Sequence, residues 1–205
     1  MTVEYVEKVY NRYSSVYDLI FGKVFNSGRE RAPQLLDLSP GTRLLEVGVG
    51  TGLAIPLLPR NINITGVDLS QKMLNQARKR MDDLEIQNVQ LLKMDATKLM
   101  FPDNSFDRVL AAYFISTVPD PVGVISEMKR VCAPGGYLVF LNHFRYNVPI
   151  VGTLEKHLSP LFYRIGFRTD LDVNELMKEA GLVIETLEKI DFLGHWRAVR
   201  CVNPG

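Results

Sequence analysis

The hydrophobic positions of the chain fall into five short apolar runs, most of them rich in Val, Leu and Ile. Runs of this length, bounded by glycine, aspartate or proline, are typical of buried β-strands. Segments with apolar residues at helical spacing lie between several of these runs. The pattern predicts strands over residues 42–48, 63–69, 89–95, 106–114 and 135–144.

The clearest helical pattern lies between the second and third runs. In residues 70–83, Met73, Ala77 and Met81 recur at the spacing that places them on one face of a helix. Ser70 precedes this pattern and is a residue type that caps helix N-termini through its side-chain oxygen. The spacing therefore predicts an amphipathic helix that begins just after Ser70.

A second helix is predicted over residues 119–131. Asp120 is a suitable cap, Pro121 suits the first helical position, and the sequence APGG at 133–136 predicts a turn after it. Strands and helices thus alternate along the chain. Such alternation predicts an α/β fold with a doubly wound, mostly parallel sheet, helices on both faces, and a ligand crevice at the carboxyl ends of the strands.

Composition limits the classes of protein. A chain of 205 residues with 46% hydrophobic and 23% charged residues suits one domain spanning residues 1–205. A net charge of +1 gives no overall basic field, so we expect no nucleic-acid partner. Cys132 and Cys201 lack the spacing of a disulfide motif or of metal ligands, which favours a reducing compartment, the cytoplasm. No cluster of His, Asp and Glu has the spacing of a metal site, so we expect no metal. No apolar run reaches the roughly 20 residues of a membrane-spanning helix.

An acidic residue precedes three glycines at every second position: Glu46, then Gly48, Gly50 and Gly52. A dinucleotide-binding GxGxxG motif would need glycine where this chain has Leu53. A carboxylate at this strand end would repel a pyrophosphate but suits a ligand with a cationic amine, and glycines let the backbone approach the ligand. S-adenosylmethionine has such an amine.

Two further acidic residues follow the next two predicted strands. Asp68 lies where a carboxylate hydrogen-bonds the ribose hydroxyls of a nucleoside. Asp95 and the backbone of Ala96 lie where they can meet an adenine edge. Three acidic residues at three successive strand ends are consistent with one ligand. We therefore expect S-adenosylmethionine as cofactor and S-adenosylhomocysteine as its product.

Residues 42–144, with the motifs LLEVGVGTG, GVDLS and LKMDATKLMFPDNSFDRVLAAY, resemble the class I S-adenosylmethionine-dependent methyltransferases. The resemblance implies a Rossmann-like, seven-stranded sheet with its last strand antiparallel, and residues 181–202 suit the final two strands. It also implies backbone contacts from the segment around Ala112. Arg29 either pairs with the cofactor carboxylate or is a solvated residue. The predicted cofactor-binding residues are Tyr17, Arg29, Glu46, Gly48, Gly50, Thr51, Gly52, Asp68, Leu69, Asp95, Ala96, Ala112 and Tyr113.

Two segments outside this region differ from it in character. Residues 1–25 carry apolar and aromatic residues at helical spacing, which predicts an amphipathic helix. This helix is either a lid over the cofactor or an interfacial helix that lies on lipid. Residues 145–170, the predicted substrate-side insertion, mix apolar residues with basic ones, which suits acyl chains and a phosphate. The predicted substrate-binding residues are Arg145, Tyr146, Arg164 and Arg168.

The sequences YDLIFGKVFNSGRERA, AAYFISTVPDPVGVISEMKRVCAPGG and NHFR resemble the bacterial phosphatidylethanolamine N-methyltransferases of the peripheral type. This resemblance implies stepwise methylation of a phospholipid amine toward phosphatidylcholine. It also implies an anionic membrane surface as partner and peripheral association with the cytoplasmic membrane. The same motifs partly overlap the quinone-biosynthesis methyltransferases. A soluble quinone or small-molecule methyltransferase and a non-catalytic cofactor-binding membrane module therefore stay open as alternatives, and the oligomeric state is not predicted.

Methyl transfer to an amine requires alignment of the reacting atoms and an acceptor for the proton of the ammonium. His143, at the end of the fifth predicted strand, is either that acceptor or a structural histidine. Tyr17 and Tyr113 are predicted to orient the amine. A quaternary ammonium product donates no hydrogen bonds, so the aromatic faces of Tyr17, Tyr113, Phe114 or Trp196 are candidates to hold it, unless these rings belong to the core.

Overall fold

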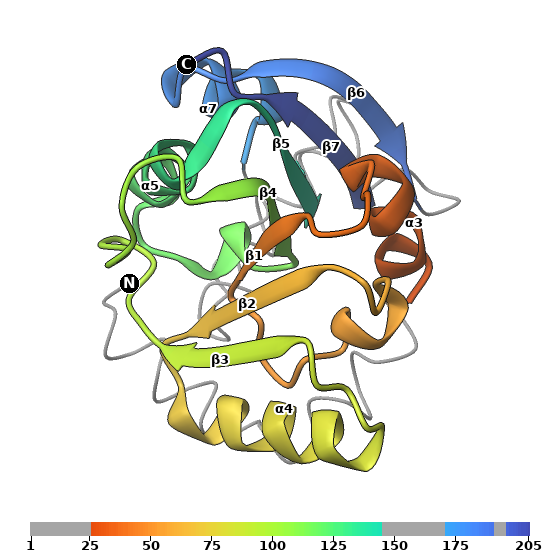
Figure 1. The fold of residues 1–205 in the computed structure, drawn as a ribbon. Helices are drawn as coiled ribbons and strands as arrows, with labels where there is room; N and C mark the ends of the chain where they lie inside the picture. The colour runs from red at the N-terminus through yellow and green to blue at the C-terminus, as the bar shows by residue number, and fades with distance from the viewer. Residues whose placement is uncertain (1–25, 145–170, 191–195) are drawn as a thin grey trace.

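A computed structural model describes residues 26–144, 171–190 and 196–205 of the chain. These residues form a seven-stranded sheet in the order β3-β2-β1-β4-β5-β7-β6 (Figure 1). The pairs among β1 to β5 are parallel, and β7 is antiparallel to both β5 and β6. The prediction of a mostly parallel, seven-stranded sheet is confirmed. The strands are β1 (Arg43–Val47), β2 (Asn63–Asp68), β3 (Val89–Lys93), β4 (Phe106–Ala112), β5 (Cys132–His143), β6 (Val183–Lys189) and β7 (Trp196–Val202).

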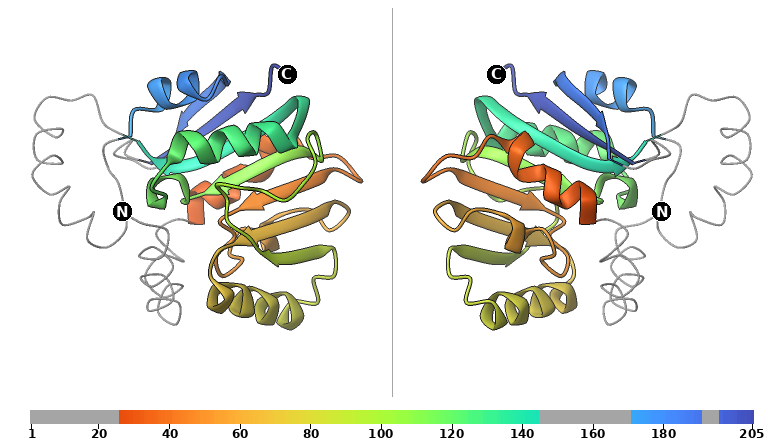
Figure 2. Two further views of the ribbon diagram at one scale, coloured as in Figure 1. Left: turned by 90° about the vertical axis from the view of Figure 1, so that its left-hand side faces the viewer. Right: turned by 90° about the vertical axis from the view of Figure 1, so that its right-hand side faces the viewer.

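Helices cover both faces of this sheet, as predicted (Figure 2). On one face lie α3 (Asn26–Leu36) and α4 (Gln71–Asp83), and on the other lie α5 (Pro121–Val131) and α7 (Val173–Glu179). Within the described ranges, no helix has both the length and the apolar character needed to cross a bilayer. The predicted helix at 1–25 and the predicted insertion at 145–170 lie outside the described residues.

The sheet separates two hydrophobic cores. Leu44 packs toward α3 and α4, whereas the next residue, Leu45, packs toward α5 and α7. In the same way Val109 and Leu110 of β4 enter opposite cores. Successive side chains of a strand point to opposite faces, so a strand covered on both faces needs apolar residues at consecutive positions. This requirement explains why the strand sequences are continuous apolar runs.

Both predicted helix starts are confirmed. The Ser70 hydroxyl accepts a hydrogen bond from the backbone N–H of Met73 at 3.2 Å, and α4 begins at the next residue. The Asp120 carboxylate accepts one from the backbone N–H of Gly123 at 2.9 Å, with Pro121 as the first residue of α5. These side chains satisfy backbone donors that have no partner within the helix.

The strand that follows α5 begins earlier than the sequence predicts. The sequence APGG predicts a turn, yet β5 starts at Cys132 and runs through these residues, with an irregular register against β4. The buried side-chain amide of Asn203 donates to the carbonyl oxygens of Cys132 at 2.7 Å and Lys129 at 3.2 Å. A residue near the C-terminus thus fixes the path of the chain here, which local sequence signals do not reveal.

The C-terminal end of α3 is fixed to the sheet by two arginines. The Arg108 Nε donates to the carbonyl oxygen of Leu36 at 2.7 Å, and Arg200 donates to that of Leu35 at 3.5 Å. The two guanidinium groups lie over the ring of Tyr137, at 4.5 and 4.3 Å from its centroid. Cations are favourable at this end of a helix because the last carbonyl groups carry partial negative charge. This contact helps to fix α3, whose first turn lies near the candidate site.

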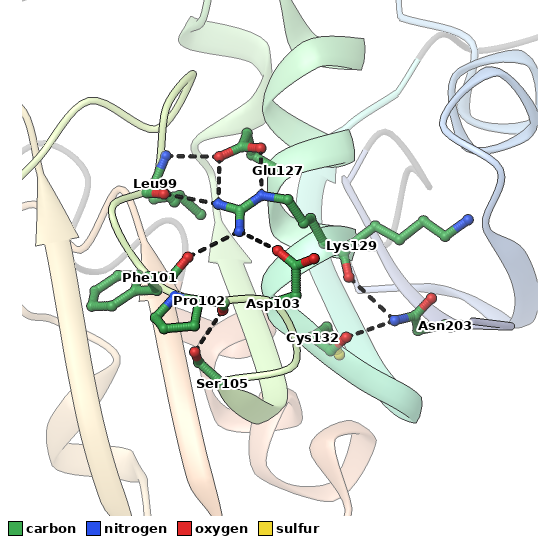
Figure 3. A network of polar contacts seen from close by, with 10 residues as sticks. Leu99, Phe101, Pro102, Asp103, Ser105, Glu127, Lys129, Cys132 and Asn203 are labelled. Carbon is green, nitrogen blue, oxygen red and sulfur yellow. Dashed lines mark hydrogen bonds and ion pairs between the residues drawn. The ribbon is translucent and has the colours of Figure 1, made fainter.

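Arg130 connects the loop between β3 and β4 to α5. Figure 3 labels its hydrogen-bond partners Leu99, Phe101, Asp103 and Glu127. Its guanidinium donates to the Glu127 carboxylate at 2.8 Å and to Asp103 at 2.7 Å. It also donates to the carbonyl oxygens of Leu99 at 2.8 Å and Phe101 at 2.9 Å. One planar side chain therefore satisfies two carboxylates and two loop carbonyls at once, which suits the fork geometry of arginine.

Replacement of Arg130 by Met should destabilise the protein by about 2–4 kcal/mol, because Met keeps the apolar stem but leaves the loop carbonyls without their donor and the Glu127 carboxylate with only the backbone N–H of Leu99. Urea denaturation measures this loss. Lys72→Met, at an exposed position of α4, is the matched control and should change stability by less than about 0.5 kcal/mol. Equal stabilities of the two variants would contradict the role given to Arg130.

Candidate active site

A crevice lies at the carboxyl edge of the sheet. Its walls come from the turns that follow four neighbouring strands, β1 to β4. Its empty space is about 830 Å³, a figure that includes space open to solvent. The position agrees with the rule that parallel sheets bind ligands beyond the carboxyl ends of their strands. Its lining includes Gly48, Gly50, Asp68, Leu69, Asp95, Ala96, Ala112, Tyr113 and Phe114.

The three glycines of the turn after β1, Gly48, Gly50 and Gly52, have different structural roles. All three have positive φ angles. A Cβ on Gly48 would collide with the ring of Phe114, and a Cβ on Gly52 would lie 3.2 Å from the Cβ of Ala77 on α4. A Cβ on Gly50 would meet nothing closer than 4.0 Å. Gly48 and Gly52 are therefore required by packing, and Gly50 is the glycine that leaves room on the crevice side.

Asp68 joins the glycine turn to the end of β2. One oxygen of its carboxylate accepts a hydrogen bond from the backbone N–H of Gly50 at 2.9 Å. The other oxygen accepts one from the backbone N–H of Ser70 at 2.8 Å. These bonds orient a carboxylate that also lines the crevice. Such a fixed acceptor suits the hydroxyl groups of a ribose.

Asp95 is also oriented by its neighbours. Its Oδ1 accepts from the backbone N–H of Thr97 at 2.9 Å and from the hydroxyl of Thr97 at 2.8 Å. Asp95, Ala96 and Thr97 all line the crevice. The end of β3 thus presents a carboxylate and a backbone segment side by side, as expected for contact with an adenine edge.

Glu46 is buried at the end of β1, with 2% of its surface exposed, and it does not line the crevice. Its Oε2 has no hydrogen-bond partner in the described part of the chain. Burial raises the pKa of this carboxyl to about 8, the positive charge of Arg29 opposes the rise, and the negative charge of Asp68 adds to it. A cationic group would supply the partner that this carboxylate lacks.

Beyond the crevice, the edge of the sheet carries a cluster of aromatic rings. The Tyr113 ring contacts the Trp196 ring edge-on, with 5.3 Å between centroids, and Trp196 contacts the ring of His143 at 5.4 Å. The guanidinium of Arg29 lies 5.2 Å from the centroid of the Tyr113 ring. These four side chains come from α3, β5, β7 and the residue after β4, so they meet only in the folded protein.

The structure brings together eight of the predicted cofactor residues along the crevice: Gly48, Gly50, Asp68, Leu69, Asp95, Ala96, Ala112 and Tyr113. Glu46, Thr51, Gly52 and Arg29 are not among the residues that line it. The cofactor role of all these residues stays a prediction. Tyr17, Arg145, Tyr146, Arg164 and Arg168 lie outside the described residues. Sequence analysis missed the contributions of Met73, Thr97, Thr117 and Val118 to the crevice, because nothing in their local sequence distinguishes them from core or turn residues.

Arg200 does not line the crevice. It pairs with Glu185 at 2.6 Å and helps to cap α3. Among the residues that the structure places, no three His, Cys, Asp or Glu side chains are arranged to bind a metal ion. The crevice lining combines the carboxylates of Asp68 and Asp95 with backbone groups, aromatic rings and apolar side chains such as those of Met73 and Val118.

Known proteins share both this sequence and this fold. A family model described as a methyltransferase domain matches residues 45–140. The chain is 38% identical over 185 residues to a phosphatidylethanolamine N-methyltransferase of Cereibacter sphaeroides, and the alignment covers 90% of each protein. It is 32% identical over 171 residues to a demethylmenaquinone methyltransferase of Listeria welshimeri, covering 78% of this chain and 72% of that protein.

Among solved structures, a SAM-dependent methyltransferase from Thermotoga maritima matches with a TM-score of 0.70 and 26% identity, covering 97% of this chain and 99% of that one. The chain therefore belongs to the class I S-adenosylmethionine-dependent methyltransferases, and S-adenosylmethionine is its cofactor.

The residues of the crevice fit this cofactor. Asp95 with Ala96 would hold the adenine, and the oriented carboxylate of Asp68 would hold the ribose. Glu46 lies outside the crevice lining, but its unpaired oxygen suits the ammonium of the methionine end. A Cβ on Gly50 would meet no atom closer than 4.0 Å, so this glycine leaves room for a ligand. When bound, the cofactor supplies an electrophilic methyl group for transfer.

Glu46 should make the stability of the cofactor-free protein depend on pH. Its folded-state pKa of about 8 lies above the ordinary value of 4.5, so its contribution to stability is fully present below about pH 4.5 and is lost as the pH rises through about 8. Glu46→Gln, which stays neutral, removes this dependence. Thermal unfolding of both proteins from pH 5 to 8 should show a steeper decline for the wild type. Parallel curves would show that Glu46 ionises normally.

Proposed function

We propose that the protein methylates the amine of phosphatidylethanolamine in successive steps toward phosphatidylcholine. The similarity to the Cereibacter sphaeroides phosphatidylethanolamine N-methyltransferase carries this proposal. That alignment spans 185 residues, far beyond the matched methyltransferase domain at 45–140. It therefore includes the flanking segments, where methyltransferases that share a cofactor differ in substrate.

The chemistry of the sheet edge supports an amine substrate. A primary ammonium must lose a proton before its nitrogen can act as a nucleophile, so a nearby neutral acceptor assists the reaction. His143 lies at the end of β5, 7% exposed, and its ring contacts Trp196, which in turn contacts Tyr113 of the crevice lining. In this proposal His143 takes the proton and the Tyr113 hydroxyl orients the amine.

The proposal includes peripheral binding to the cytoplasmic membrane. Phosphatidylethanolamine stays in the bilayer, so the enzyme must work at an anionic lipid surface. We assign this contact to the amphipathic pattern of residues 1–25 and to the basic, apolar pattern of residues 145–170. In the second segment, Arg145, Arg164 and Arg168 are the residues suited to a lipid phosphate.

Methylation of a quinone is the second candidate function. The observation that favours it is the 32% identity with the demethylmenaquinone methyltransferase of Listeria welshimeri. A quinone precursor is methylated at a ring carbon, whereas the lipid is methylated at a nitrogen. The two candidates therefore differ in the group that must occupy the edge beside Tyr113.

Incubation of the protein with S-adenosylmethionine labelled in its methyl group separates these functions. We expect label in phosphatidylethanolamine presented in anionic liposomes, and far less label in demethylmenaquinone dispersed in the same lipid without phosphatidylethanolamine. Label in the quinone alone would favour the second candidate. Cofactor binding by calorimetry without transfer to either acceptor would indicate a non-catalytic protein.

His143→Gln should lower kcat for phosphatidylethanolamine by about 100-fold or more, because glutamine fills similar space but accepts no proton at neutral pH. Its affinity for S-adenosylmethionine should stay near that of the wild type, since His143 does not line the crevice. Single-turnover assays and calorimetry measure the two quantities. A variant with normal kcat would reduce His143 to a structural residue.

A further inference from the structure

The order of the strands arranges the candidate ligand groups in a row along the carboxyl edge of the sheet. Asp95, Asp68 and the glycine turn follow β3, β2 and β1, which are neighbours in that order. The next positions along the edge belong to β4, β5 and β7. If the first three strand ends hold the cofactor, the next three are the positions available to a substrate.

These next positions carry Tyr113, His143 and Trp196. Tyr113 directly follows β4, and His143 is the last residue of β5. β7 is antiparallel to β5, so its first residue, Trp196, is paired with His143 at the same edge. Trp196 lies late in the chain and reaches the carboxyl edge of the sheet because β7 runs antiparallel to β5.

The backbone of Tyr113 is held in an unfavourable conformation. Its φ angle is +59°, in the left-handed region that bulky residues rarely adopt, while its N–H donates to the carbonyl oxygen of Leu141 at 2.6 Å. A Cβ on Gly28 would collide with the Tyr113 hydroxyl, so α3 leaves space for the ring. Strain of this kind is found where a side chain must point in a particular direction.

The Tyr113 ring already contacts a cation. The guanidinium of Arg29 lies 5.2 Å from its centroid, within the range of a cation–π interaction. Trp196, which contacts the Tyr113 ring edge-on, is the aromatic type whose face attracts cations most strongly. The aromatic rings at this edge therefore attract positive charge without carrying a full negative charge.

Such a surface meets two opposing needs of repeated N-methylation. A carboxylate beside the nitrogen would stabilise the ammonium and so disfavour the neutral amine that reacts. Each added methyl group also removes an N–H donor, until the trimethylated nitrogen donates no hydrogen bond at all. Aromatic faces attract the cation at every stage and do not depend on N–H groups.

We infer that Tyr113 and Trp196 form the subsite for the methylated nitrogen, and that Trp196 determines how tightly the trimethylated headgroup is held. This inference rests on the proposed function. In this inference, Trp196 is the residue that distinguishes a charged quaternary headgroup from a neutral group of the same shape. Tyr113 connects this subsite to the crevice, which it also lines.

Trp196 is the only tryptophan in the chain, so biosynthetic incorporation of fluorinated tryptophans changes this ring alone. Successive fluorines withdraw electron density from the ring face while changing its shape little. The ligands are a short-chain phosphatidylcholine and its neutral analogue, in which a tert-butyl carbon replaces the quaternary nitrogen. Calorimetry with the cofactor-bound protein measures both affinities.

We expect the affinity for the phosphatidylcholine to fall stepwise with the number of fluorines, by about fivefold to thirtyfold in total. The affinity for the neutral analogue should change little. Trp196→Leu should likewise remove the preference for the charged ligand, whereas Trp196→Phe should keep part of it. Phe101→Leu is the matched control, because Phe101 also makes an edge-on ring contact, with Phe106 at 5.0 Å, but packs against the hydrophobic core on the other face of the sheet from Trp196.

An equal response of both ligands to fluorination would overturn the inference, and so would a charge preference that survives in Trp196→Leu. Because the fluorinated proteins keep the native fold, the test does not depend on whether Trp196→Leu folds. Failure of the proposed function gives a different result, which is no methyl transfer to phosphatidylethanolamine by the wild type. Transfer to the lipid together with an unchanged charge preference would reject the subsite alone.

Discussion

The structure depends above all on the parallel pairing of β1 with both β2 and β4. This pairing brings the carboxyl ends of the central strands to one edge, where short turns can surround a ligand. The hydrogen bond from Gly50 to Asp68 then joins the first turn to the second strand at 2.9 Å. The reversed direction of β7 extends the same edge, because it places Trp196 beside the end of β5.

Two features at this edge cost stability. Glu46 is a buried carboxyl with an oxygen that lacks a partner among the described residues, and Tyr113 has a left-handed backbone conformation. Both are unfavourable in the free protein, and both lie where the cofactor and the substrate are expected. The arginine contacts that fix α3 and the β3–β4 loop lie elsewhere in the fold and help to offset these costs.

The family shares the cofactor half of the site, so the substrate must be decided by the other half. The relatives named above include a lipid N-methyltransferase and a quinone methyltransferase, and the chain is similar to both. The edge formed by Tyr113, His143 and Trp196 offers an imidazole and aromatic faces. This combination suits a nitrogen that must first lose a proton and later carries a permanent positive charge.

The sequence alone determined the first four strand segments, both helix starts and the acidic residues at the strand ends, because hydrophobic periodicity and capping are local properties. Tertiary structure decided what depends on residues distant in the chain. In the folded protein Gly48 packs against Phe114, where a Cβ would collide with the ring. The side-chain amide of Asn203 binds the carbonyl oxygen of Cys132, where β5 begins. Tertiary structure also brought Trp196 to Tyr113, a contact that exists only because β7 runs antiparallel to its neighbours.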